Sequence, residues 1–321
     1  MAHLTPTKRS QLEVLMKLGK KQTEIAELLE VAQSTVSREL RRIKNPYESF
    51  YAQMDAETKR HKAYEKRIFW WKRDPDLLKH VIKHLRKRWS PEHIVGDLRR
   101  QRKPSVSAKT IYEYVWKHPA LHRYLRYKGK SPWRGGPVGD RTCIANRRDI
   151  SERPKCVDTR RRYGDWESDL IIGKEHKGAI ATFVERKSRY TCAVLLRNQS
   201  SREFLRAARR VFRSFPLQLR RTMTHDNGSE IALHERITRS VQIMVYCARP
   251  YHAWERGLCE QTNGLIRDYF PKGTDFRTLT QQRLDTVIES INTRPRHCLQ
   301  FRSPKMVFEK VRKRYAFHGS E

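Results

Sequence analysis

Apolar residues recur at helical spacing in the first part of the chain. Within residues 22–42 a polar break separates two short apolar faces, made of Ile25, Ala26 and Leu29 and then of Val36 and Leu40. This pattern predicts two helices joined by a tight turn, and the small side chain of Ala26 lets them cross closely. Glu30 occupies the turn position that glycine often fills. The pattern is that of a helix-turn-helix.

A second pair of helices is predicted further along the chain. Ser90 followed by Pro91, and Ser107, are residues typical of the position just before a helix. We therefore expect helices over residues 91–101 and 108–117, joined by a basic loop. Their apolar residues fit an ordinary core as well as a second helix-turn-helix, so DNA binding by this pair stays open.

The pattern changes after residue 162. Alternating or continuous apolar runs predict strands over 165–172, 179–185, 191–196, 221–225 and 241–247, with helices over 202–215, 230–238 and 281–293. Three meandering strands, followed by strands that alternate with helices, are the order of an RNase H-like sheet. The periodicity by itself supports only an α/β class.

These patterns predict a multidomain protein, with an N-terminal all-α helix-turn-helix region followed by an α/β core. We expect a helix-turn-helix DNA-binding domain over 1–50 and a second helical region over 51–126. A basic linker rich in glycine and proline follows over 127–158, and the core with C-terminal helices fills 159–321.

The charge of the chain adds a class of partner. The 321 residues include 69 Lys and Arg against 35 Asp and Glu, so the formal net charge is +34. The excess is spread along the whole chain, which indicates binding to nucleic acid or to another anionic surface. No apolar run is long enough for a membrane span, and the six cysteines form no CxxC pair. We expect reduced thiols and a cytoplasmic protein without a membrane partner.

The second helix of the first pair is the expected DNA reader. In a helix-turn-helix its first turn enters the major groove. We expect contacts to base edges from Gln33, Ser34, Thr35 and Ser37, and contacts to phosphates from Arg38, Arg41 and Arg42. The alternative is a helical hairpin with a solvated basic face.

Three acidic residues stand at positions that suit a metal centre. Asp169 lies within the first strand, Asp226 directly follows the fourth, and Glu260 lies on a later helix. Gathered beside the sheet, they would repel one another unless cations compensated them. Mg²⁺ prefers such oxygen ligands, and a pair of ions about 3.5–4 Å apart activates a water or a 3′-hydroxyl. Arg267, two turns after Glu260, is placed to meet a phosphate.

Each acid also has an ordinary explanation. Asp-Asn-Gly is a common turn, and a lone helical glutamate is usually solvated. Asp165 and Glu167 share the strand face of Asp169, so the spacing leaves them open as substitutes, together with Glu230 and Glu255. Cys259 has no ordered His–Asp partner and is read as a packing residue.

A family resemblance joins these residues. The segments GDWESDLIIGK, THDNGSE and ERGLCEQTNGLIRDYFPKGTDF resemble the integrase-like core of bacterial DDE transposases, most closely those of the insertion-sequence-thirty family. STVSRELRR, WSPEHI, KTIYEYV, ISERPKCVDTRRRYGDWE and NTRPRHCLQFRSPKMVFE extend the resemblance over nearly the whole chain. It implies that Asp169, Asp226 and Glu260 are the metal-binding triad and that Arg267 is the basic residue after the glutamate. The chain departs from the usual pattern at Ser168, Ile231, Leu258, Cys259 and Gln261.

The resemblance implies an RNase H-like, retroviral integrase-type core and the function of a transposase. The helix-turn-helix would bind the terminal inverted repeats of its own element. The core would cleave a DNA strand and transfer the exposed 3′-hydroxyl to target DNA. Two Mg²⁺ ions, with Mn²⁺ as a substitute, would serve as cofactors, and a homodimer or larger assembly would join the two ends at the bacterial nucleoid. Trp254 and Arg256 are candidates for a base wedge and a phosphate contact.

Three other functions compete with this interpretation. A DNA-binding regulator would retain an inert core, whereas all three acids are present here. A nuclease or integrase with another substrate would share the same core chemistry. A packaging protein would bind any sequence with a steep salt dependence, whereas a transposase prefers its own repeat.

Overall fold

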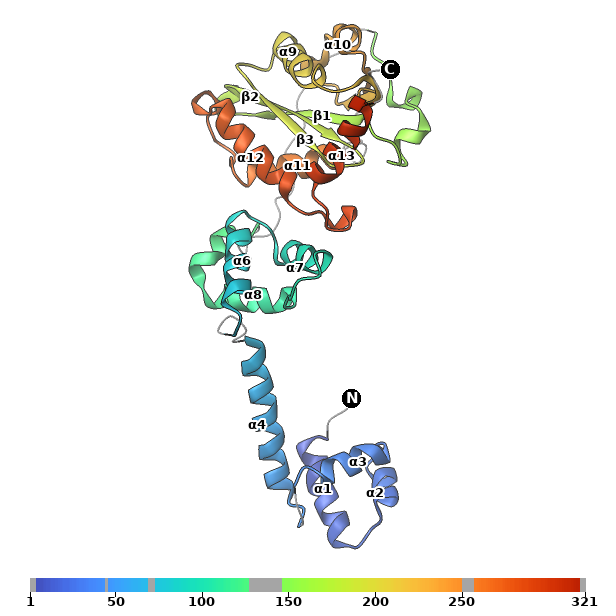
Figure 1. Ribbon diagram of the computed structural model, residues 1–321, viewed down its shortest axis with the longest axis vertical. Coiled ribbons are helices and arrows are strands. Elements are labelled where there is room, and N and C mark those ends of the chain that lie inside the picture. Colours follow the sequence, from blue (N-terminus) through green and yellow to red (C-terminus); the bar gives the residue numbers. More distant parts are fainter. Residues whose placement is uncertain (1–3, 44–45, 69–72, 127–145, 250–256, 318–321) are drawn as a thin grey trace. The chain divides into compact units, whose positions relative to one another are not determined.

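The chain forms two compact units, residues Met1–Leu78 and Lys79–Glu321. The computed structural model describes residues 4–43, 46–68, 73–126, 146–249 and 257–317 (Figure 1). The boundary between the units falls within helix α6 (Pro75–Arg86). Most of the linker predicted over 127–158 lies outside the described residues, as do Trp254, Glu255 and Arg256. The finer division into four regions stays a prediction.

The N-terminal unit is all α-helical. It contains α1 (Pro6–Lys17), α2 (Gln22–Leu28), α3 (Gln33–Leu40) and α4 (Ser49–Ile68). Both apolar faces predicted from the sequence contribute to one core, in which Ile25 and Val36 are fully buried. Glu30 adopts a φ of 49° in the turn between α2 and α3, the left-handed conformation for which glycine is usually selected.

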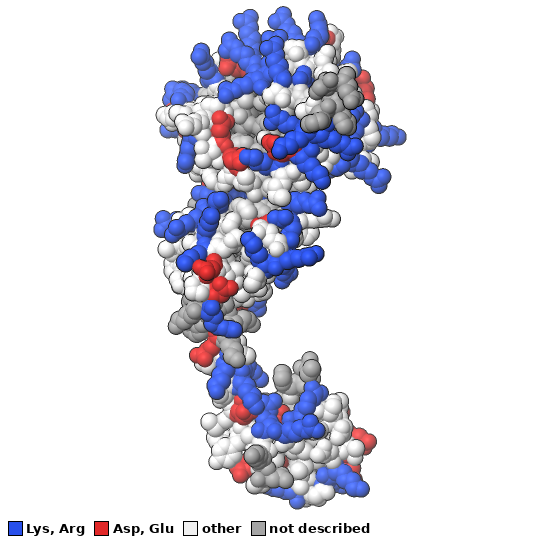
Figure 2. Space-filling view, in the orientation of Figure 1, with Lys and Arg blue, Asp and Glu red and all other residues white. Residues whose placement is uncertain are grey.

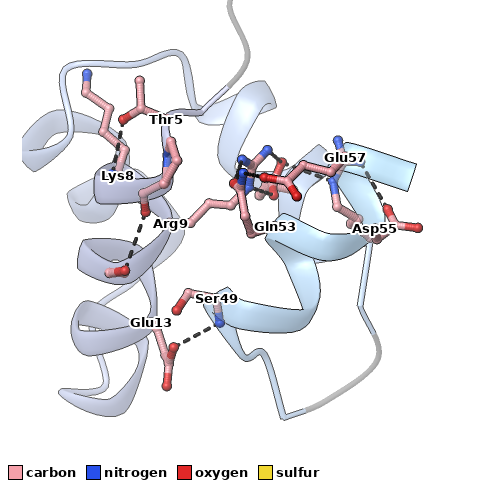
Figure 3. A network of polar contacts seen from close by, with 12 residues as sticks. Thr5, Lys8, Arg9, Glu13, Ser49, Gln53, Asp55 and Glu57 are labelled. Atoms are coloured by element: carbon pink, nitrogen blue, oxygen red, sulfur yellow. Dashed lines mark hydrogen bonds and ion pairs between the residues drawn. The ribbon is translucent and has the colours of Figure 1, made fainter. Parts of the chain in front are cut away.

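A buried ion pair ties α1, α3 and α4 together. The Arg9 Nε donates to Glu39 Oε1 at 2.6 Å, and both side chains are almost completely buried. Arg9 also donates from Nη1 to Gln53 on α4, and Arg42 Nε donates to the other oxygen of Glu39. Figure 3 shows this network between the helices. Its charged groups are mutually satisfied, which is the condition for burying them.

The C-terminal unit begins with helices predicted from their caps. Helices α7 (Pro91–Arg100) and α8 (Ala108–Lys117) follow α6. The Oγ atoms of Ser90 and Ser107 accept hydrogen bonds from the backbone N–H groups of His93 and Thr110, as the capping pattern predicts. Gly96 on α7 leaves room for the ring of Phe301, because a β-carbon there would lie 2.1 Å from that ring.

A five-stranded mixed sheet forms the centre of this unit. Its strands are β1 (Asp165–Ile172), β2 (Ala179–Glu185), β3 (Thr191–Leu196), β4 (Thr222–His225) and β5 (Met244–Cys247). The order is β3-β2-β1-β4-β5; β2 is antiparallel to both β1 and β3, whereas β4 pairs in parallel with β1 and β5 in parallel with β4. This arrangement confirms the predicted RNase H-like sheet.

Helices cover both faces of the sheet. Helices α9 (Ser201–Phe212) and α10 (His234–Val241) pack on one face, and α11 (Gly257–Arg267) and α12 (Gln281–Thr293) on the other (Figure 1). The last helix, α13 (Pro304–Phe317), contributes Phe308 to the α9 core. The prediction of a helix ending at 238 and a strand starting at 241 was wrong at this junction. The helix continues to Val241, and Gln242, with a φ of 54°, turns the chain into β5.

The alternation of β1 places its acidic residues on one face. Trp166 is completely buried in the α9 core and donates from Nε1 to the carbonyl of Leu219. Ile171 belongs instead to the α11–α12 core. Because side chains alternate along a strand, Asp165, Glu167 and Asp169 lie on the α11 face with Ile171.

Short 3-10 helices connect these elements. Residues 149–153 contact β4 and β5, because Asp149 bridges to Cys247 and Arg153 Nη1 donates to Thr224 Oγ1. Among the described residues no helix combines the length and the apolar character that a membrane crossing requires. The 3-10 segments are η1 (Pro119–Tyr124), η2 (Ile150–Glu152), η3 (Lys155–Val157), η4 (Lys174–His176), η5 (Leu217–Leu219), η6 (Ser229–Ile231), η8 (Phe276–Thr278) and η9 (His297–Leu299).

Candidate active site

One of the predicted acids lies on β1, and another directly follows β4, the parallel neighbour of β1. Glu167 on β1 is registered with Thr224 on β4. Asp169 lies two residues beyond Glu167 on β1, and Asp226 directly follows His225, the last residue of β4. Neighbouring strands are about 4.8 Å apart, and the charges of both carboxylates act on His225. We therefore expect the two carboxylates to lie near each other where β4 ends.

Asn263 links α11, the helix that carries Glu260, to Asp169. Its Nδ2 donates to Asp169 Oδ2 at 2.8 Å, and its Oδ1 accepts from Thr182 Oγ1 at 3.1 Å. The other oxygen of Asp169 accepts from the backbone N–H of Leu170. Glu260 lies three residues before Asn263, and residues at this spacing share one helix face. The exposed side chain of Glu260 is therefore on the face of α11 that is bound to Asp169.

Glu167 fixes the start of the same helix. This carboxylate is 1% exposed. Its Oε2 accepts from the backbone N–H groups of Leu258 and Cys259, at 3.2 and 3.1 Å, and its Oε1 accepts from Arg186 Nη1 at 2.8 Å. A carboxylate suits the first turn of a helix, where N–H groups lack intrahelical partners. Glu167 thus anchors the residues that directly precede Glu260.

The structure distinguishes the three acids of β1, which the alternation of the strand had left equivalent. Asp165 accepts two hydrogen bonds from the guanidinium of Arg162 and a third from Thr222 Oγ1. Asp165 and Glu167 are both buried and hold the fold together, whereas Asp169 is only partly buried. Of the three acids on this face of β1, Asp169 is the one that solvent can reach.

His225 forms a cluster that the sequence reasoning missed. Its Nε2 lies 3.2 Å from Asp226 Oδ1 and 3.1 Å from Glu230 Oε1, and its Nδ1 lies 2.8 Å from Ser168 Oγ. Among the described residues this is the one group of three acidic, histidine or cysteine side chains whose ligand atoms all lie within 4.8 Å of one another. Asp169 and Glu260 are not part of it. In the sequence this cluster is indicated by His225, directly before Asp226, and by Glu230, four residues after Asp226.

The acids around His225 control its charge. Burial lowers the pKa of His225, but the hydrogen bond that its ring donates to Glu230 and the charges of Asp226 and Glu230 outweigh burial, so this pKa lies above its usual value. Both ring nitrogens are engaged in hydrogen bonds. The neighbouring carboxylates therefore favour the charged form of His225, and both of its ring nitrogens already have partners within the protein.

Comparisons with known proteins identify the family of the chain. Residues 159–253 match the Integrase core domain family. A transposase for insertion sequence element IS4351 of Bacteroides fragilis is 37% identical, over 96% of this chain and 96% of its own length. The transposase InsI for insertion sequence element IS30A of Escherichia coli K12 is also 37% identical, over 97% of this chain and 84% of its own. The chain belongs to the IS30 family of insertion-sequence transposases. It is thus an enzyme of DNA transposition.

A solved integrase structure matches over the same region with a low score. The catalytic core domain of BIV integrase is 17% identical, covers 47% of this chain and 98% of its own, and has a TM-score of 0.38. The assignment of the fold rests on the strand order and pairing described above.

The integrase-type core of this transposase family implies dependence on a divalent metal, and the donors here fit that requirement. Asp169, Asp226 and Glu260 offer only carboxylate oxygens, the ligand type that Mg²⁺ and Mn²⁺ accept. The side chains of Asp169 and Asp226 are partly exposed and that of Glu260 is exposed, so water and substrate can reach them.

The predicted DNA contacts differ in their exposure. On α3, Gln33, Ser34 and Arg38 are exposed, as is Arg41 just after the helix, while Thr35 and Ser37 are partly buried. Arg42 is engaged within the protein, because it donates to Glu39 and to Asp55. On the face drawn in Figure 2, Lys and Arg side chains cover more of each unit than Asp and Glu do. The contacts of these residues with DNA remain predictions.

Arg267 is held against the core. Its Nη2 donates to the carbonyl of Ile172 at 2.6 Å, and its guanidinium carbon lies 5.4 Å from the centre of the Phe276 ring. Burial lowers the pKa of Arg267, and its Nη1 has no hydrogen-bond partner in the described structure. Because Nη1 is itself buried, the structure does not present it to DNA, and the phosphate contact of Arg267 stays a prediction.

Proposed function

We propose that Asp169, Asp226 and Glu260 hold two divalent cations with which this transposase cuts the ends of its element and joins them to target DNA. One observation carries the proposal. Asp169 follows the last registered pair of β1 and β4 and Asp226 follows the end of β4, while Asn263 binds the Glu260 face of α11 to Asp169.

The chain's residues act by holding and positioning. In strand cleavage a water oxygen bonds to phosphorus and the leaving 3′-oxygen departs as a hydroxyl. In strand transfer that 3′-hydroxyl attacks a target phosphorus, and a second strand is broken. The bound cations would lower the pKa of the attacking oxygen and stabilise the leaving one. Asn263 and Glu167 keep the helix that carries Glu260 in register with Asp169, as such positioning requires.

Recognition of the element's ends is proposed for the N-terminal unit. The exposed residues at the start of α3, Gln33 and Ser34, would read base edges, and Arg38 and Arg41 would bind phosphates. Thr35, Ser37 and Arg42 would contribute less, because each is partly buried. The helices over 51–126 and the linker over 127–158 would follow the DNA backbone. A homodimer or larger assembly would hold two ends together, with Mg²⁺ as the cation and the nucleoid as the place of action.

Glu260→Gln tests the catalytic assignment. The substrate is a duplex with the element's own end sequence, recovered from DNA flanking the gene, and the readout is strand nicking and joining with Mg²⁺ or Mn²⁺. We expect nicking at the repeat boundary to fall by at least about a hundredfold in the variant, because a neutral amide is a poor ligand for a hard cation. Binding to the repeat should persist.

Glu289→Gln is the matched control, since Glu289 is an exposed helical glutamate on α12 whose partner is Lys305. This variant should cleave like the unmodified protein. Equal cleavage by Glu260→Gln and the unmodified protein would refute the role of Glu260. Tight repeat binding without any cleavage would favour a regulator instead.

Two substitutions on α3 test the mode of recognition. Gln33→Ala should reduce the preference for the repeat by about 1–3 kcal/mol, because it removes a base contact. Arg41→Ala should weaken binding to all sequences equally and lower the slope of log affinity against log salt by about one. Fluorescence anisotropy with repeat and scrambled duplexes at several salt concentrations measures both. A uniform loss with Gln33→Ala would refute base reading at that position.

A further inference from the structure

A large cavity in the C-terminal unit lies beside the helix that carries Glu260. Its volume is about 790 Å³, and its lining comes from the α7–α8 region, from α11 and from residues after α12. This size falls within the roughly 300–1,000 Å³ of sites that enclose organic ligands. Leu258 and Gln261, which lie on either side of Glu260 in sequence, belong to the lining.

The cavity carries a large excess of positive charge. Its acidic lining residue is Glu92, whereas its arginines are Arg88, Arg126, Arg160, Arg189, Arg294 and Arg296. Gathering so many guanidinium groups in a partly enclosed space is unfavourable without an anion. Burial, followed by the charge of Arg294, lowers the pKa of Arg296 to about 10. Arg126 is paired with Asp268 outside the lining, and the remaining excess of positive charge favours an occupant with negative charge.

Two buried groups have unused donors at the cavity. Arg294 is 3% exposed, and its Nε has no hydrogen-bond partner in the described structure. Trp89 is 7% exposed, and its Nε1 lacks a partner as well. Buried donors are normally satisfied. These two atoms are themselves buried in the wall, so recognition of an occupant depends on the other lining groups.

Aromatic rings make up another part of the lining. Trp116 is 58% exposed, an unusual position for so large an apolar ring, and Tyr112, Tyr124 and Trp89 also line the cavity. Burial, with the charges of Arg294 and Arg296, lowers the pKa of His93 to about 4, so its ring is neutral at neutral pH. Rings and neutral polar groups bind a flat heterocycle, whereas an inorganic anion needs only the arginines.

We propose that this cavity binds an unpaired nucleotide of a DNA strand, with its phosphate on the arginines and its base against the Trp116 ring. Base stacking on aromatic residues combined with a basic groove is the general mode of single-strand binding. The proposal rests on the function proposed above, because a strand held here would lie against the start of α11, the helix that carries Glu260. It adds that DNA next to the cut is unpaired when it is bound.

The test measures single-strand binding without metal, so it does not depend on cleavage. The probe is an oligonucleotide of the element's end with a short single-stranded 3′ extension that contains 2-aminopurine. We expect its fluorescence to be quenched on binding. Trp116→Ala should weaken binding of the extended duplex by about tenfold, since stacking contributes about 1–3 kcal/mol per base. Affinity for the blunt duplex should be unchanged, and Trp116→Phe should restore most of the loss.

Charge is tested with a matched pair of variants. Arg126→Gln, at the cavity, should weaken the extended duplex more than the blunt one, whereas Arg202→Gln, an exposed arginine on α9 outside the lining, should affect both equally. Equal affinity of Trp116→Ala and the unmodified protein for the extended duplex would overturn the proposal. Competition by inorganic phosphate as effective as competition by a mononucleotide would also overturn it, because it would reveal an anion site only. If Glu260→Gln loses cleavage but still quenches the 2-aminopurine fluorescence, the cavity and the catalytic site are separate.

Discussion

Glu39→Ala is expected to destabilise the N-terminal unit by about 3–5 kcal/mol, the cost of leaving a buried charge without its partner. The charge left behind is that of Arg9, which is 1% exposed and donates to Glu39 from two nitrogens. A unit of this size has a total stability of about 4–12 kcal/mol. The substitution therefore removes much of it, and binding to the element's ends should fall with the folded fraction.

Hydrogen exchange in the full chain measures this effect. Amides of α1 and α3 should exchange faster in Glu39→Ala, while amides of the sheet keep their protection, because the two units are separate compact bodies. Replacing both partners, Arg9→Met with Glu39→Leu, should recover much of the stability, since no buried charge remains. Glu24→Ala on α2, an exposed position, serves as the control. If Glu39→Ala lowered the free energy of unfolding by less than about 1 kcal/mol, the Arg9–Glu39 pair would not be buried in solution.

The periodic elements were predictable because burial imposes them on the sequence. The α2–α3 pair, the caps at Ser90 and Ser107 and the strands β1 to β3 all match the structure. The error lies at the junction of α10 and β5. There the left-handed residue that ends the helix is Gln242, which carries no glycine or proline signal. The Arg9–Glu39 pair was also missed, since a buried ion pair joins residues with no periodic relation.

The three acids of the site could be predicted from the sequence, but the hydrogen-bond partners that position the site could not. Asp169, Asp226 and Glu260 stand out through strand position and family resemblance, and Asp165 and Glu167 share the same alternation. What separates these carboxylates is long-range pairing. Glu167 finds its partners in Arg186 and in the backbone of α11, more than ninety residues away in the case of the helix. Neither contact leaves a local pattern. The same holds for His225, whose partners Ser168 and Glu230 come from β1 and from the loop after β4.

Glu167→Gln is expected to reduce strand cleavage by about a hundredfold, because a shift of about 1 Å in a positioned group has this cost. Glutamine has the shape of glutamate, but one of its two terminal atoms becomes a donor. That NH₂ group would face either the N–H groups of Leu258 and Cys259 or the guanidinium of Arg186. The start of α11 should then move, and Glu260 with it. The metal concentration for half-maximal cleavage should rise.

Asp165→Asn separates positioning from general loss of stability. Asp165 is as deeply buried on the same face of β1 and is likewise bonded to an arginine, but its hydrogen-bond partners, Arg162 and Thr222, are not on α11. Both variants should unfold at lower temperature, since hydrogen bonds to a charged group contribute about 1.5–3 kcal/mol each. Only Glu167→Gln should shift the metal dependence, and excess Mn²⁺ should restore part of its cleavage. If Asp165→Asn shifted the metal dependence equally, Glu167 would contribute to stability but not to the positioning of Glu260. The alignment of Glu260 would then depend on Asn263.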